Sequence, residues 1–148
     1  MRGVLLLVAA VVLAGCAMAP EVGKDGLGLH RATMSAQPGW VVMRYAQGSV
    51  PYWVEPEARL GSKDVERAEA LFDESGQAVV LLVFNQAGRA RLEQMTREAI
   101  DQPLAIVIDG QLRLAPLVQA PISDGHIVLS GFTGADEALQ FAAALTPP

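Results

Sequence analysis

Cysteine, basic residues and aromatic residues are all scarce in this sequence, and each scarcity excludes a class of structure or function. The 148 residues include a single cysteine, Cys16, so the chain cannot form an internal disulfide. Lys and Arg together number 11 against 16 Asp and Glu, and the formal net charge is −5. Without a basic run, and with only 5% aromatic residues, the chain lacks both the phosphate-binding charge and the stacking surface of a nucleic-acid-binding protein. We therefore expect no nucleic-acid partner.

The longest apolar run lies near the N-terminus and ends close to that cysteine. Arg2 precedes an apolar stretch over residues 4–14, which is shorter than the about 20 residues that a membrane-spanning helix needs. An apolar run of this length followed by small residues is typical of a secretory signal peptide. Residues 13–16 read Leu-Ala-Gly-Cys, which resembles the lipobox of bacterial lipoproteins.

The lipobox resemblance implies a lipid anchor. Residues 1–15 would be the signal peptide, and Cys16 would become the first residue of the mature chain, with acyl chains such as palmitate on its thiol and its new amino group. The implied partner is the lipid bilayer, and the implied location is the cell envelope, facing the periplasm. Ala17 follows the cysteine, which indicates the outer membrane if the host has two membranes. A plain secretory signal with an incidental cysteine and an uncleaved membrane helix are the alternatives.

Beyond the cysteine the sequence divides into two parts. Residues 16–38 carry several glycines and two prolines and show no hydrophobic period, which predicts a lipidated flexible tether. His30 lies in this segment, and we interpret it as a solvated linker histidine. Residues 39–148 have the length of one folded domain and are too few for two.

The clearest secondary-structure signal covers residues 103–118. Residues 104–108 are apolar at every position, which predicts a strand covered on both faces of a sheet. The pair Asp109 and Gly110 tolerates the positive φ angles of a type I′ hairpin turn. Residues 111–114 alternate between polar and apolar side chains, as a return strand would, and Pro116 ends the ladder because proline has no N–H to donate.

The rest of the domain is predicted to be a mixture of strands and helices. Further strands are predicted at 40–46, 50–54, 78–84 and 126–130, and helices at 62–76, 85–100 and 133–145. Pro51 places the 50–54 strand at a sheet edge, and we expect the 78–84 strand beside the 104–108 strand. The predicted helix caps are Ser62, Asn85 and Thr133, the last with Asp136 in capping-box spacing, and Gly76 ends the first helix. The order indicates an α+β fold with a single mixed, mostly antiparallel sheet and helices on one face.

Five short motifs in this order resemble the head subdomain of the first periplasmic domain of SecD, a subunit of the bacterial protein translocase SecDF. They are VVLLVFNQAG at 79–88, LEQMT at 92–96, LAIVIDGQLRLAP at 104–116, ISDGHIVLSG at 122–131 and FTGADEA at 132–138. The resemblance implies the SecD head-like fold and a role in meeting exported polypeptides. Arg113 stands where the family often has a small or apolar residue.

The resemblance carries over no catalytic role. The sequence offers no membrane helix after residue 16, so the proton-driven activity of SecD is not transferred, and the family motifs contribute turns and core positions. We therefore expect an envelope lipoprotein that is not an enzyme and binds a protein partner or an unfolded polypeptide, without cofactor or metal. The 50–54 edge strand could accept an extended segment by backbone pairing.

Two alternative functions follow from other features of the chain. Ser123, Asp124 and His126 lie close together in sequence and suggest a hydrolase triad, but no Gly-x-Ser-x-Gly elbow accompanies them. We interpret Asp124 as a turn residue and His126 as a surface residue at a strand end. The apolar strands could instead enclose a small apolar ligand or lipid, as in a carrier protein, although about 130 mature residues in a layered sheet leave little room beyond core packing.

Overall fold

The structure is a computed structural model, and it describes residues 22, 26–45, 48 and 50–146. The predicted signal peptide and the anchor residue Cys16 lie outside the described residues. The described chain is an α+β fold with two α-helices and nine strands, which confirms the predicted fold class. All of its strand pairs are antiparallel.

The strands form two sheets, where the sequence predicted one. The large sheet has the order β2-β3-β1-β7-β8 with β4 also paired to β1, and the small sheet has the order β5-β6-β9. The bounds in the large sheet are β1 Leu27–Thr33, β2 Val41–Met43, β3 Tyr52–Val54, β4 Leu60–Gly61, β7 Leu104–Ile108 and β8 Gln111–Leu114. Those in the small sheet are β5 Val65–Phe72, β6 Ala78–Phe84 and β9 His126–Leu129.

The expected pairing of the 78–84 strand with the 104–108 strand is wrong, because each has other partners. Strand β7 lies between β1 and β8, and β6 lies between β5 and β9. Two segments that the sequence did not identify as strands, 27–33 and 65–72, fill the positions beside β7 and β6. The expected edge position of the 50–54 strand is also wrong, since β3 pairs with β2 on one side and with β1 on the other. Pro51 precedes β3, so no ladder hydrogen bond is lost there.

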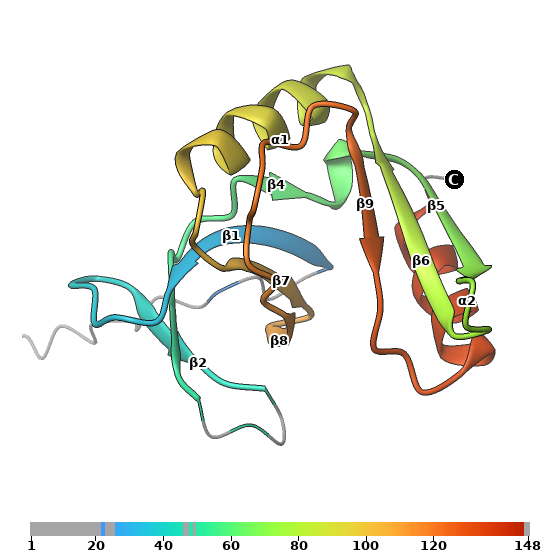
Figure 1. Ribbon diagram of the computed structural model, residues 1–148, viewed down its shortest axis with the longest axis horizontal. Coiled ribbons are helices and arrows are strands. Elements are labelled where there is room, and N and C mark those ends of the chain that lie inside the picture. Colours follow the sequence, from blue (N-terminus) through green and yellow to red (C-terminus); the bar gives the residue numbers. More distant parts are fainter. Residues whose placement is uncertain (1–21, 23–25, 46–47, 49, 147–148) are drawn as a thin grey trace, which may run out of the picture.

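One core joins the two sheets and both helices. Helix α1 (Gln86–Glu98) lies across one end of the molecule and helix α2 (Ala135–Leu145) packs against β5 and β6 of the small sheet (Figure 1). The core contains Leu29 and Ile106 from the large sheet, Leu82 from the small sheet, and Leu92 from α1, all fully buried. A second, smaller cluster on the opposite face of the large sheet contains Ala105 and Val107. Strand β7 is therefore covered on both faces, as predicted.

The predicted hairpin between β7 and β8 is confirmed. Asp109 and Gly110 have φ angles of 48° and 79°, which are the positive values that both central residues of a type I′ turn require. In β8, Leu112 is buried while Gln111 and Arg113 are exposed, in agreement with the predicted alternation. The Asp109 side chain also accepts a hydrogen bond from the Gly26 amide at 2.9 Å, so the turn holds the start of β1.

The prediction of a flexible tether over residues 16–38 is wrong for residues 27–33, because these form strand β1. Residues 27–33 pair with β7 from Leu27 to Arg31 and are mostly buried. Gly28, one of the glycines that suggested flexibility, is needed for packing: a Cβ atom there would lie 2.4 Å from the His30 Nε2 atom. The segment is therefore a central strand whose glycine permits the close approach of a neighbouring side chain.

His30 corrects the prediction of a solvated linker histidine, since its side chain is fully buried. Its Nδ1 atom lies 2.8 Å from the Glu55 carbonyl oxygen. A carbonyl oxygen only accepts, so Nδ1 carries the proton and Nε2 is left as an acceptor, which has no hydrogen-bond partner among the described residues. Burial lowers the pKa of His30 below its ordinary value of 6.5, although the carbonyl and carboxylate of Glu55 act in the opposite direction.

We expect acid to destabilise the fold through His30. The unfolded chain binds a proton on this residue at about pH 6.5, whereas the folded chain does so only at its lowered pKa, so the free energy of unfolding falls as the pH drops through the interval between the two values. For one proton the slope cannot exceed about 1.4 kcal/mol per pH unit. Urea unfolding between about pH 5 and pH 8 measures it. His30→Gln should flatten the slope, and His126→Gln, at an exposed position, should retain it. Equal slopes in the wild type and His30→Gln would contradict the role of His30.

The predicted helix over residues 62–76 is wrong, because residues 65–72 form strand β5. Residues 65–72 pair with β6 from Phe84 back to Ala78, and the expected N-cap Ser62 belongs to a short 3-10 helix, η1, over Ser62–Asp64. Gly76, with a φ of 80°, lies in the hairpin turn that joins β5 to β6. The Asp73 carboxylate orders this turn by accepting hydrogen bonds from the Ser75 amide and hydroxyl and from the Gln77 amide.

Both other predicted helices are confirmed, with one change of cap. Asn85 caps α1, since its side chain accepts a hydrogen bond from the Gly88 amide at 2.9 Å. The predicted cap Thr133 is wrong for α2, since the N-cap is Gly134 and no side chain caps this helix. The Glu137 carboxylate, and not that of Asp136, accepts from the Thr133 amide at 2.7 Å and from its hydroxyl at 2.8 Å. Arg113 contributes an ion pair of 2.6 Å to the same carboxylate. These contacts together lower the pKa of Glu137 to about 2, and the hydrogen bond from the Thr133 amide has the largest effect.

Candidate functional site: a groove beneath helix α1

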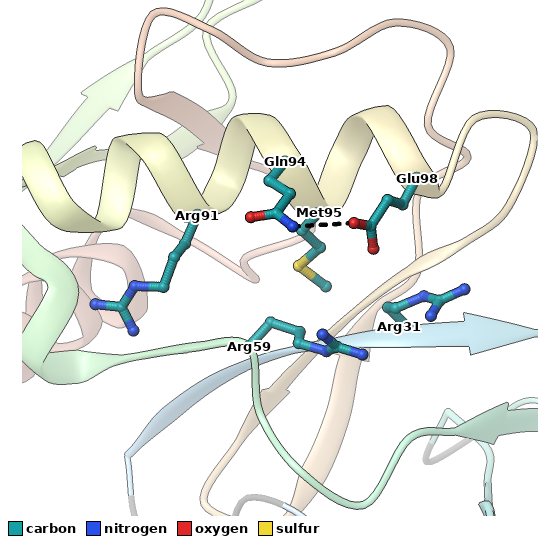
Figure 2. A pocket seen from close by; sticks show the side chains of 6 residues that line it. All are labelled: Arg31, Arg59, Arg91, Gln94, Met95 and Glu98. Atoms are coloured by element: carbon teal, nitrogen blue, oxygen red, sulfur yellow. Dashed lines mark hydrogen bonds between the residues drawn. The ribbon is translucent and has the colours of Figure 1, made fainter.

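An open groove lies between helix α1 and the end of strand β1, and it is lined mainly by polar side chains. It has a volume of about 180 Å³ and is lined by Arg31, Arg59, Arg91, Gln94, Met95 and Glu98. Figure 2 shows that the guanidinium groups come from separate elements, namely β1, the loop before β4, and α1. The backbone holds two of these elements together, because the Glu55 amide donates to the Arg31 carbonyl at 2.9 Å and the Arg59 amide donates to the Leu29 carbonyl at 2.8 Å.

Two of the three arginines are already paired with carboxylates. Arg59 donates from Nε and Nη2 to the two oxygens of Glu55, at 2.9 and 2.7 Å. The hydrogen bond from Arg59 is the main reason that the pKa of Glu55 lies below its ordinary value. Arg91 donates to the buried carboxylate of Asp64, which also accepts from the Gly61 amide. The guanidinium groups of these two arginines are therefore held in place by carboxylates of this chain.

Arg31 is different, because no side-chain carboxylate of the described residues lies within ion-pair distance of it. Its guanidinium carbon lies 5.9 Å from the centre of the Trp40 ring, which is a cation–π distance. Glu98 lines the same groove, but its carboxylate accepts from the Gln94 side chain at 3.1 Å (Figure 2). The Arg31 guanidinium thus keeps hydrogen-bond donors available to a ligand in the groove.

A second hollow adjoins the groove at Arg31, which lines both. Its volume is about 230 Å³, and its lining consists of Arg31, Ala32, Thr33, Gln37, Trp40, Ala99 and Gln102. The two hollows share Arg31 and together offer guanidinium, amide and hydroxyl groups next to one indole ring. Amide side chains can both donate to and accept from a peptide backbone, so this lining suits an extended polypeptide better than a compact apolar molecule.

The residues considered for a hydrolase triad do not line the groove. Across the part of the chain that the structure describes, no three His, Cys, Asp or Glu side chains come together in a way that could hold a metal ion. The Asp124 carboxylate of the considered triad accepts from the His126 amide at 3.1 Å and lies 3.7 Å from the His126 ring, in an exposed turn. The Ser123 carbonyl accepts from Arg89. These three residues therefore serve as turn and surface residues in the described structure.

The sequence reasoning missed the groove. Arg31 and Trp40 were not singled out together, because residues 27–33 were assigned to a tether, and the only signal was the short alternation of Leu27, Leu29 and Arg31 on one face. The predicted anchor Cys16, the one site residue expected from the sequence, lies outside the described residues. The expected edge strand for backbone pairing is also absent at β3, which has neighbours on both sides.

The described chain is an α+β domain made of two antiparallel sheets and two helices, with an open groove beside α1. Comparison with protein families then places it: the model of the SecDF P1 head subdomain matches residues 40–147, so the chain belongs to that family. The resemblance drawn from the five motifs is thereby confirmed.

Curated relatives agree with this assignment. The chain is 36% identical over 86 residues to the protein translocase subunit SecDF of Thermus thermophilus, covering 58% of this chain and 12% of the relative. It is 35% identical over 92 residues to the protein translocase subunit SecD of Acidaminococcus fermentans, covering 62% of this chain and 22% of the relative. The chain therefore spans less than a quarter of the length of these relatives.

Solved structures show the same fold. A SecDF structure described as that of a membrane component that enhances protein export superposes with a TM-score of 0.68 at 23% identity, covering 83% of this chain and 63% of the other. SecDF in its super-membrane-facing form gives a TM-score of 0.69 at 22% identity, covering 83% and 19%. Within the part of the chain that the structure describes, neither α1 nor α2 is long and apolar enough to cross a bilayer.

Proposed function

We propose that this chain is a lipid-anchored protein of the cell envelope whose SecD head-like domain binds exported polypeptides, or a protein partner, without catalysing a reaction. The lipobox-like residues 13–16 support the anchor at Cys16 and the periplasmic side of the membrane as the location. In a host with two membranes, Ala17 favours the outer one. Membership of the SecDF P1 head family supports a role in protein export.

The groove beneath α1 is the observation that carries the binding proposal. It is open, it shares Arg31 with the second hollow, and the polar side chains that line the two match the hydrogen-bonding groups of a polypeptide in extended form. The alternative of an apolar ligand receives no support from the described hollows. The one lined by Ile108, Leu114, Leu129 and Phe132 has a volume of about 20 Å³, which is enough for about one water molecule.

Binding to an unfolded polypeptide tests the proposal. We expect the purified full chain in detergent to bind a fluorescent, permanently unfolded secretory precursor and to bind the folded form of the same protein weakly, as read by fluorescence anisotropy. Gln102→Trp should lower the affinity about tenfold by filling the exposed wall of the second hollow, a loss of about 1.4 kcal/mol.

A matched variant separates this from a general effect of a new tryptophan. Glu74→Trp places the same side chain in the exposed turn between β5 and β6, away from the groove, and should leave the affinity unchanged. Equal affinities for the folded and the unfolded precursor, or equal losses in both variants, would contradict the proposed site.

A further inference from the structure

The charges that line the groove bear on which side chains of a bound polypeptide it prefers, a question that depends on the proposed binding of polypeptides. Arg59 and Arg91 are held by Glu55 and Asp64. Among the described residues Arg31 has no such carboxylate, and it is the residue that both hollows share. An arginine guanidinium presents its donors in a planar fork that matches the two oxygens of a carboxylate.

We propose that Arg31 binds an acidic side chain of an extended polypeptide, while the Trp40 ring contacts an apolar side chain next to it. The ring lies against the guanidinium, with 5.9 Å between the Arg31 guanidinium carbon and the ring centre. This contact presents Arg31 beside an apolar surface and lowers the entropy that its side chain loses on binding. The second hollow adds the amide groups of Gln37 and Gln102, which can pair with the backbone of the segment.

Glu98 weakens the preference of the groove for an acidic side chain, because it places a negative charge in the same groove. Its carboxylate lies on the wall that α1 contributes, on the opposite side of the groove from Arg31 (Figure 2). It repels an anionic group. No Lys or Arg of the described residues lies within ion-pair distance of the Glu98 carboxylate, and the Arg59 guanidinium acts on it only at longer range. Removing the negative charge at residue 98 should therefore strengthen the binding of an acidic segment, and removing the positive charge at residue 31 should weaken it.

The test uses two short fluorescein-labelled peptides that are identical except for one central residue, Asp in one and Asn in the other, each beside a leucine. In low salt we expect the full chain to bind the Asp peptide about tenfold more tightly than the Asn peptide, as for one charge-assisted hydrogen-bonded pair. Arg31→Gln should make the two affinities equal. Glu98→Gln should increase the preference for Asp. Arg97→Gln removes the same charge from an exposed position on α1 and should leave the preference unchanged.

The outcomes separate this inference from the proposed function. Equal binding of both peptides by the wild type, or an equal loss of preference in Arg31→Gln and Arg97→Gln, would overturn the role of Arg31 and leave polypeptide binding intact. Failure of the wild type to bind either peptide or the unfolded precursor would overturn both. Unchanged thermal unfolding of Arg31→Gln shows that a loss of preference is a binding effect and supports the inference.

Discussion

Cys16→Ser should abolish acylation of the chain and leave its signal peptide attached. Cys16 is the only cysteine, so no other thiol can receive the lipid, and a serine hydroxyl is a much weaker nucleophile than a thiolate. Cleavage before residue 16 follows acylation in the lipoprotein pathway that the lipobox implies. Labelling of cells with an alkyne analogue of palmitate should therefore show full incorporation in the wild type and background incorporation in the variant, with accumulation of the longer precursor.

A second variant tests whether the position of the thiol matters. Ser75→Cys in the Cys16→Ser background returns one thiol to the chain, in an exposed turn without a lipobox, and should not restore the label. The anchor proposal fails if the wild type incorporates no lipid, or if Cys16→Ser is processed and labelled as the wild type is.

Leu29→Ala should lower the free energy of unfolding by about 3–5 kcal/mol, the cost of removing a large buried side chain and leaving a cavity. Leu29 is fully buried in β1, where it lies opposite Ile106 of β7 and Leu60 of β4. A loss of this size is a large part of the about 5–15 kcal/mol that stabilises a typical domain. Urea unfolding at neutral pH measures it directly.

Met34→Ala is the matched control for this loss. Met34 follows β1 directly and its side chain is 60% exposed, so its truncation should change the free energy of unfolding by no more than about 0.5 kcal/mol. If residues 27–33 were the flexible tether that the sequence suggested, both substitutions would have the same small effect, and the assignment of β1 to the core would be wrong.

Elements whose local signals agreed with their final environment could be predicted from the sequence. The β7-β8 hairpin combined a fully apolar strand with a turn pair that accepts positive φ, and the structure has both. Helix α1 combined a capping Asn85 with buried Leu92 and Met95 at helical spacing. In these segments propensity, pattern and turn chemistry indicate the same structure, which is the condition for a reliable prediction.

The prediction for residues 65–72 failed because these residues prefer a helix locally, whereas strand β5 is formed by pairing with another segment of the chain. Glu66, Ala68 and Glu69 are residues that favour helices, and Leu71 and Phe72 complete a spacing that fits a helix. In the folded chain, residues 65–72 instead pair along nearly the whole of β6. Strand propensity depends on the neighbouring strand and not on the residue alone, so this pairing was not visible in the sequence.

The groove could not be predicted because its parts are brought together only by tertiary structure. Arg31 lies on β1, a strand that the glycines around it kept from being predicted. Arg59 lies in a loop that backbone hydrogen bonds hold to that strand, and Arg91 lies on α1. Each arginine alone is indistinguishable from the solvated charges on the rest of the surface. The specific signal, a guanidinium near the Trp40 ring without an ion-paired carboxylate among the described residues, exists only once β1 is placed beside β7.

Site-specific crosslinking in living cells tests the central claim most directly, that this domain contacts polypeptides as they are exported. A photoreactive amino acid at Gln37, an exposed residue lining the second hollow, should form an adduct with a stalled secretory precursor, and the same group at Ser75, in the turn between β5 and β6, should not. Adducts of equal yield from both positions, or none from Gln37 while the precursor is stalled, would contradict the account.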